Sequence, residues 1–171
     1  MITVYALGVV VSMLGIGWGG TFSAMGADNI ETNKVQGLEF TTTHLKSEPN
    51  YIAPDGMAVR LLPQISHGGI AHFELPPGAT SSAVSHRSVN EIWYFLAGRG
   101  QMWRKQGIHE EIVDVYPGVA VTIPRGTHFQ LRSFGHEPLG AVGVTMPPWP
   151  GCEEAVPEKG HWPSPPAKCK K

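Results

Sequence analysis

The sequence predicts an all-β fold, a closed antiparallel barrel or jelly roll, on two observations. First, at least eight short segments with the alternation or aromatic content of strands follow one another between residues 57 and 146. Second, the 15 prolines and 21 glycines are scattered along the chain rather than gathered into one tract. This distribution is typical of short strands joined by turns, and not of a helical bundle. With 171 residues, the chain is expected to form one domain with a substantial core.

The expected strands can be placed in order, because turn signals separate them. They are residues 57–62, 70–75, 91–96, 101–105, 110–115, 119–123, 128–133 and 139–146. Pro63 should end the first strand, and the turn at 98–100 should pair strand 101–105 with strand 91–96 as a hairpin. Strand 139–146 should be the last, since prolines crowd the segment that follows. The barrel is therefore assigned to 51–147, with a polar arm at 28–50 before it and a Pro-rich tail at 148–171.

The first 27 residues contain no charged side chain and include an apolar run. Small residues at 23–27 could form a signal-peptidase site, although no basic residue precedes the apolar run. Three interpretations stay open: a signal peptide of an exported or periplasmic protein, an uncleaved membrane anchor, or an upstream start in a cytoplasmic protein.

The net charge bears on the class of partner, and the cysteines bear on the cellular compartment. The net charge of −1 and the pI of about 6.7 leave no electrostatic footprint for nucleic acid. Both cysteines, Cys152 and Cys169, lie in the tail. They could form a disulfide in an exported protein and would stay reduced in the cytosol.

The most informative stretch is residues 78–100, which holds His86 and Glu91 ahead of an apolar strand. A carboxylate that opens a buried strand needs a cation or hydrogen-bond donors. Imidazole and carboxylate are common ligands of transition metals, so the pair could belong to a metal site. The alternative is that the two side chains bond each other without a metal.

This chain resembles the cupin family. The family's first motif is G-x5-H-x-H-x(3,4)-E-x6-G, and its second is G-x5-P-x-G-x2-H-x3-N. The positions that match are Gly78, His86, Glu91 and Gly98 in the first motif, and Gly118, Pro124 and Gly126 in the second. The runs SHR…EIWYFL and TMPPWPG are similar to those of small single-domain bacterial cupins of unassigned activity. The resemblance implies a double-stranded β-helix, also called a jelly-roll barrel.

The chain departs from the family at two of the four metal-ligand positions. Val84 replaces the first histidine, and Phe129 aligns with the last ligand. His128 lies one residue early, and a shift of one residue in a strand turns a side chain to the other face. His128 therefore faces the cavity only if the turn after Gly126 is one residue shorter than usual; otherwise Phe129 fills the barrel.

The resemblance implies a divalent transition metal, namely iron, manganese, nickel or zinc. Its ligands would be His86, Glu91 and, in the first register only, His128. Two imidazoles and one carboxylate with open positions are the ligand set of non-haem iron oxygenases and of catalytic zinc sites. In a catalytic site, Glu91 would act as a ligand or as a base.

Other side chains are candidates for contact with a ligand. Alternation places Trp93 and Phe95 on the face of Glu91, although ordinary core packing explains them as well. Trp103 could join them from the next strand. Gln130 would face inward together with His128, and Arg132 on the same side could bind a carboxylate, or could simply be a surface charge.

The sequence therefore leads to one function and one alternative. The leading hypothesis is a cupin that binds a small polar or sugar-like molecule over a single divalent metal. The alternative is a metal-free, degenerate cupin that acts as a small-molecule binding module or as a structural dimer. A homodimer is expected in either case, and whether the protein is an enzyme stays open.

Overall fold

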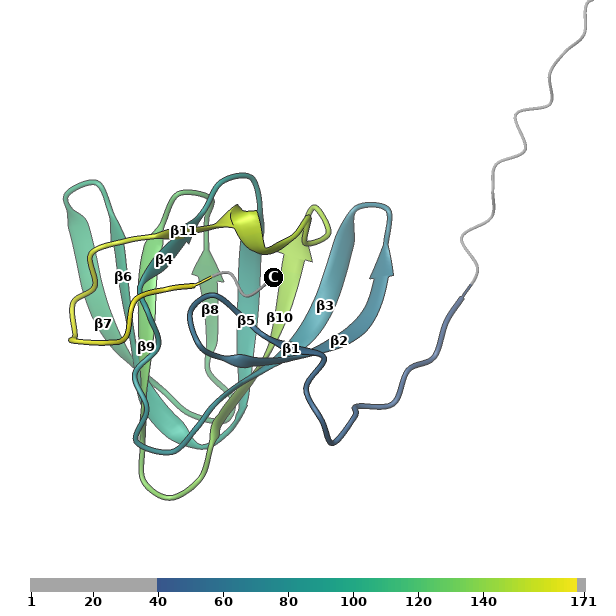
Figure 1. Cartoon of the computed structure of the whole chain (residues 1–171), viewed down its shortest axis with the longest axis horizontal. Helices are drawn as coiled ribbons and strands as arrows, with labels where there is room; N and C mark the ends of the chain where they lie inside the picture. The colour runs from purple at the N-terminus through teal and green to yellow at the C-terminus, as the bar shows by residue number, and fades with distance from the viewer. Residues whose placement is uncertain (1–39, 169–171) are drawn as a thin grey trace, which may run out of the picture. The chain divides into compact units, whose positions relative to one another are not determined.

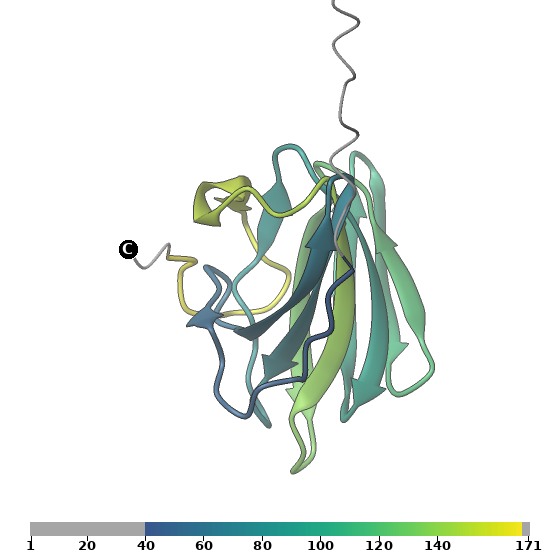
Figure 2. The same cartoon turned by 90° about the vertical axis from the view of Figure 1, so that its right-hand side faces the viewer.

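The computed structural model describes residues 40–168, which form two antiparallel sheets that face each other (Figures 1 and 2). The only helix in this range is the short 3-10 helix η1 (Cys152–Glu154), and no helix there has the length and hydropathy of a membrane span. The predicted all-β jelly roll is thus confirmed. The N-terminal segment 1–27, residues 28–39 of the arm, and Cys169 lie outside the described residues, so the signal peptide and the disulfide stay predictions.

The larger sheet has six strands in the order β1-β2-β3-β10-β5-β8. These strands are β1 (Tyr51–Ile52), β2 (Ala58–Ile65), β3 (Gly68–Leu75), β10 (Leu139–Met146), β5 (Asn90–Ala97) and β8 (Ala120–Ile123). The smaller sheet has five strands in the order β11-β4-β9-β6-β7. These are β11 (Ala155–Pro157), β4 (Val84–His86), β9 (His128–Phe134), β6 (Arg99–Gln106) and β7 (His109–Val115).

The prediction that strands 91–96 and 101–105 pair as a hairpin is wrong. β5 pairs with β10 and β8 in one sheet, whereas β6 pairs with β7 and β9 in the other. Gly98 carries the chain from one sheet to the other with a φ of +71°. A Cβ atom there would collide with the carbonyl oxygen of Pro138. The sequence thus correctly predicted a turn at 98–100, but this turn connects the two sheets instead of two paired strands.

Two prolines also behave differently from expectation. β2 runs through Pro63, which sits within a register irregularity between Leu61 and Gln64, where a missing amide is tolerated. β10 is not the last strand, as had been expected, because β11 in the tail pairs with β4. Pro157 occupies the last position of β11.

The core fills the space between the two sheets. β5 alternates as predicted: Trp93 and Phe95 are buried, while the intervening Ile92, Tyr94 and Leu96 are exposed on the outer face. Gly143 on β10 lies against the stacked rings of Phe73 and Trp93, whose centroids are 4.5 Å apart. A Cβ at Gly143 would come within 2.7 Å of Phe73, so glycine makes this stack possible.

The tail after β11 covers the outer face of the five-stranded sheet, and Figure 1 shows it crossing β6 and β7 and returning toward β1. The Gln130 amide donates to the Trp162 carbonyl and accepts from the Trp162 amide, each at 2.9 Å. Nearer the end, the Lys168 amide donates to the carbonyl of Pro54 at 2.9 Å. The tail is thus bonded to the barrel along its length.

Candidate functional site

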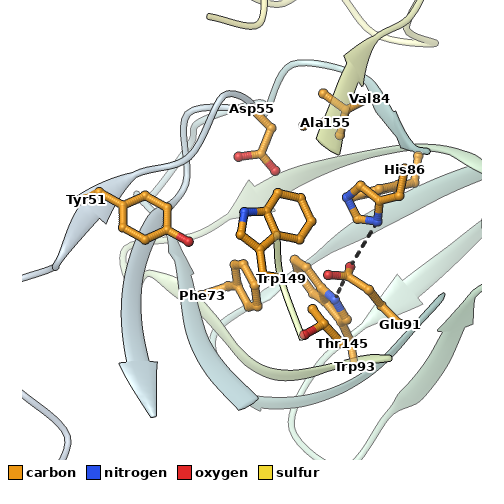
Figure 3. Close-up of a pocket in the computed structure, with 11 residues that line it drawn as sticks. Tyr51, Asp55, Phe73, Val84, His86, Glu91, Trp93, Thr145, Trp149 and Ala155 are labelled. Carbon is orange, nitrogen blue, oxygen red and sulfur yellow. Dashed lines mark hydrogen bonds and ion pairs between the residues drawn. The ribbon is translucent and has the colours of Figure 1, made fainter. Parts of the chain in front are cut away.

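A small cavity of about 40 Å³, called the inner pocket below, lies between the two sheets (Figure 3). Its polar lining residues are Tyr51, Asp55, His86, Glu91 and Thr145. Its apolar lining residues are Phe73, Val84, Trp93, Phe129, Trp149 and Ala155. A few polar side chains that converge on a largely apolar cavity are typical of a small-molecule site.

Glu91 lies at the start of β5 and is 2 % exposed. Its Oε2 accepts a hydrogen bond of 2.8 Å from the indole Nε1 of Trp93. Burial raises the pKa of Glu91 to about 8, an effect that the Trp93 hydrogen bond reduces and the carboxylate of Asp55 increases. Near neutral pH this carboxyl therefore holds its proton and can donate a hydrogen bond, so it is suited to the role of an acid rather than a base.

His86 ends β4 and is 5 % exposed. Its ring packs edge-on against Phe129 and Trp149, with centroid distances of 5.1 Å in each case. Burial lowers the pKa of His86 to about 4, and the nearby carboxylate of Glu154 offsets part of that shift. The imidazole is therefore neutral at physiological pH.

The two side chains meet without bonding each other. Nδ1 of His86 lies 3.7 Å from Oε2 of Glu91, beyond hydrogen-bond range, and this buried nitrogen has no partner among the described residues. Because both groups are neutral near pH 7, the contact is not an ion pair. The direct hydrogen bond between His86 and Glu91, one of the two readings that the sequence left open, is therefore not present.

Asp55 was missed as a site residue, because its Pro-Asp-Gly context identified only a turn. Asp55 is 7 % exposed, and its Oδ1 accepts a hydrogen bond of 3.1 Å from the backbone amide of Met57. Burial raises the pKa of Asp55 to about 6, while hydrogen bonds from backbone amides oppose the shift. Thr145 could have been found, since it is a polar residue at an inward position of the alternating strand β10.

The second motif adopts the register in which Phe129 fills the barrel. Phe129 is 1 % exposed and pairs with Val84, so both replaced ligand positions are neighbours on the pocket wall. His128 points away from the pocket, and its Nδ1 lies 3.4 Å from Oε2 of Glu158 in the tail. The shorter turn that would bring His128 inward is not present.

Three other candidate residues contact the tail instead of lining the cavity: Gln130, Arg132 and Trp103. Gln130 lies on the same face of β9 as His128, where the tail buries it and its amide donates to Trp162 and Ser164. The expectation that Gln130 faces the cavity is therefore wrong. The Arg132 guanidinium bonds Gln101 and packs over the ring of Trp162.

Trp103 donates from its indole to Glu110 at 2.7 Å and stacks on His161. Trp103 pairs with Gln130 on the face that the tail covers, so it cannot join Trp93 on the pocket wall. Phe95 is fully buried in the core and does not line the inner pocket. Of the five expected ligand-contact residues, only Trp93 lies on the pocket wall.

The residues present do not fit the metal that the resemblance to cupins implies. His86 and Glu91 supply one nitrogen and one carboxyl, while Val84 and Phe129 supply no donor atom at the other two positions. Among residues 40–168, no group of three or more His, Cys, Asp or Glu side chains could hold a metal ion. A protonated carboxyl and a neutral imidazole are instead equipped for hydrogen bonding and proton transfer.

Comparison with known proteins supports the fold. No protein-family model matches the chain. The uncharacterized protein MJ1618 of Methanocaldococcus jannaschii is 31 % identical over 113 residues, which cover 63 % of this chain and 86 % of that protein.

Among solved structures, BH2720 of Bacillus halodurans is 22 % identical with a TM-score of 0.49, over 58 % of this chain and 74 % of that one. A protein of Klebsiella pneumoniae with a double-stranded β-helix domain is 17 % identical with a TM-score of 0.49, over 60 % and 85 % of the two chains. The oxalate decarboxylase of Bacillus subtilis, described with Mn(II) centers, is 19 % identical with a TM-score of 0.50, over 57 % of this chain and 27 % of that one.

The two facing sheets and the similarity to oxalate decarboxylase define a double-stranded β-helix fold. The chain therefore has the cupin fold.

Proposed function

We propose that this cupin binds a small, uncharged polar group in the inner pocket through hydrogen bonds, without a metal. One observation carries the proposal: among residues 40–168, the buried Nδ1 of His86 has no hydrogen-bond partner, and His86 lines a cavity. A buried polar atom left without a hydrogen bond is costly, so a ligand that supplies the bond recovers free energy. Glu91, 3.7 Å from that nitrogen, offers a carboxyl proton to the same ligand.

The volume and charge of the inner pocket restrict the size and charge of the group that can bind there. A volume of about 40 Å³ accommodates roughly three water-sized groups, so a whole sugar ring does not fit and only one edge of such a ring could enter. The carboxylate of Asp55 disfavours an anion. A hydroxyl or a primary carboxamide, which combines donor and acceptor, matches the wall.

Acetamide is a suitable probe, because it is small, uncharged, and both a donor and an acceptor. We expect acetamide to shift the indole N–H resonance of Trp93, which bonds Glu91, in a saturable manner. His86→Leu should abolish saturation, because it removes the ring nitrogens and keeps an apolar side chain. The matched control is His128→Leu, which removes an imidazole outside the pocket and should bind acetamide normally. Saturation that survives in His86→Leu would refute the proposal.

The metal-dependent version makes a different prediction and is tested separately. Elemental analysis of untagged full-length protein, with metal offered back after chelation, should find no stoichiometric iron, manganese, nickel or zinc. Near-stoichiometric metal in the wild-type protein that His86→Ala loses would overturn the metal-free assignment.

A structural dimer is a second candidate, and the outer face of the six-stranded sheet favours it. Ile92, Tyr94 and Leu96 are 45 %, 49 % and 48 % exposed there, which makes an apolar stripe along β5. Light scattering should find a dimer that Tyr94→Lys converts to a monomer. A monomeric wild-type protein at micromolar concentration would remove this candidate.

A further inference from the structure

A second, larger cavity adjoins the inner pocket. This outer groove of about 390 Å³ is lined by nine residues and has about ten times the volume of the inner pocket. It is formed by β1, the part of β2 around Leu61 and Gln64, and the start of the tail, residues 149–152. The groove is therefore built from the edge of the six-stranded sheet and from a segment that the barrel strands do not include.

Two aromatic residues, Tyr51 and Trp149, line both cavities. In the view of Figure 3, the Trp149 indole lies between Tyr51 and the His86–Glu91 pair. Trp149 packs edge-on against the His86 ring at 5.1 Å, whereas Tyr51 is 38 % exposed. The two rings therefore form the boundary between the cavities, and a molecule that reaches His86 from the groove must pass beside the Trp149 indole.

The chemistry of the outer groove differs from that of the inner pocket. None of its lining residues is charged, and Gln64 contributes the only side-chain amide among them. Ile52 and Leu61 are 40 % and 47 % exposed, so apolar surface is open to solvent in the groove. Such a surface favours an uncharged ring or hydrocarbon body.

We propose that the two cavities are one binding site for a small amphipathic molecule. Its uncharged polar head, such as a carboxamide, bonds His86 and Glu91, and its ring body lies in the outer groove between Tyr51, Leu61 and Trp149. This inference rests on the proposed function, because the head occupies the inner pocket. It adds the class of ligand: since the inner pocket holds only a few atoms, the body of any larger ligand occupies the groove.

The proposal is tested with two probes that share a head, acetamide and phenylacetamide, titrated into full-length protein. The phenyl group buries apolar surface in the groove, so phenylacetamide should bind at least about tenfold more tightly than acetamide. Leu61→Asp introduces a charge at an exposed groove position. It should remove the advantage of phenylacetamide and leave the affinity for acetamide unchanged.

The matched control is Ile108→Asp, which introduces the same charge at an exposed residue outside the groove and should change neither affinity. Equal affinities for the two probes, or an advantage that persists in Leu61→Asp, would overturn the two-cavity site while the inner pocket stands. Failure of both probes to bind would overturn the proposed function and this inference together.

Discussion

The buried carboxyl of Glu91 makes stability depend on pH, and Glu91→Gln isolates that dependence. The pKa of Glu91 is about 8 in the folded protein and 4.5 in its ordinary state. Between these values the unfolded chain has released the proton and the folded chain retains it. Stability attributable to this group is therefore complete below pH 4.5 and falls as the pH rises toward 8.

The magnitude follows from the size of the window. Each pH unit inside it costs about 1.4 kcal/mol, so the wild-type protein should lose about 3 kcal/mol through Glu91 between pH 5.0 and pH 7.5. Glutamine at the same position cannot ionise and does not pay this cost. Because His86 and Asp55 titrate in both proteins, their contributions largely cancel in the difference.

Urea unfolding followed by tryptophan fluorescence, at pH 5.0 and 7.5, measures the effect. The stability of Glu91→Gln relative to the wild type should rise by about 3 kcal/mol from the lower to the higher pH. Glu137→Gln, at an exposed position in the turn before β10, should show no comparable change. A difference between Glu91→Gln and wild type that is the same at both pH values would refute the argument, since it would mean that a cation or solvent stabilises the ionised carboxylate.

Three further substitutions test the packing and register around the inner pocket. Phe129→Ala should cost about 3–5 kcal/mol in urea unfolding, because the ring is buried in the core, and a loss below about 1 kcal/mol would contradict that placement. His128→Ala should leave elemental composition and acetamide affinity unchanged, because His128 faces Glu158; a change in either would favour the inward register. Gly98→Ala should prevent folding, as judged by circular dichroism, since its Cβ would collide with the Pro138 carbonyl; a folded Gly98→Ala protein would show that the sheet crossing can shift.

Most strands could be predicted from the sequence, because period-two alternation and turn residues are local signals. All eight expected strands begin within two residues of the observed ones, and the alternation of β5 correctly separated Trp93 from Tyr94. The pairing of strands could not be obtained in this way. A glycine turn does not say whether the chain returns to the same sheet or crosses to the other, and Gly98 crosses.

The site was only partly predictable for the same reason. His86 and Glu91 were identified from motif spacing, and both line the inner pocket. The direction of His128 depends on one residue of register, which sequence alone left open. Asp55 lines the pocket because the turn that carries it packs against strands far away in the sequence. A local sequence pattern cannot predict such a contact.

The tail that covers the five-stranded sheet has a consequence for the pocket. Its end is bonded to Pro54, directly before Asp55, so the last described residue restrains the turn that supplies a carboxyl to the inner pocket. The side chain of Ser82 holds the same segment through the carbonyl of Pro165. Cleavage before Pro165 would therefore remove the restraint on the turn that carries Asp55, one of the lining residues of the inner pocket.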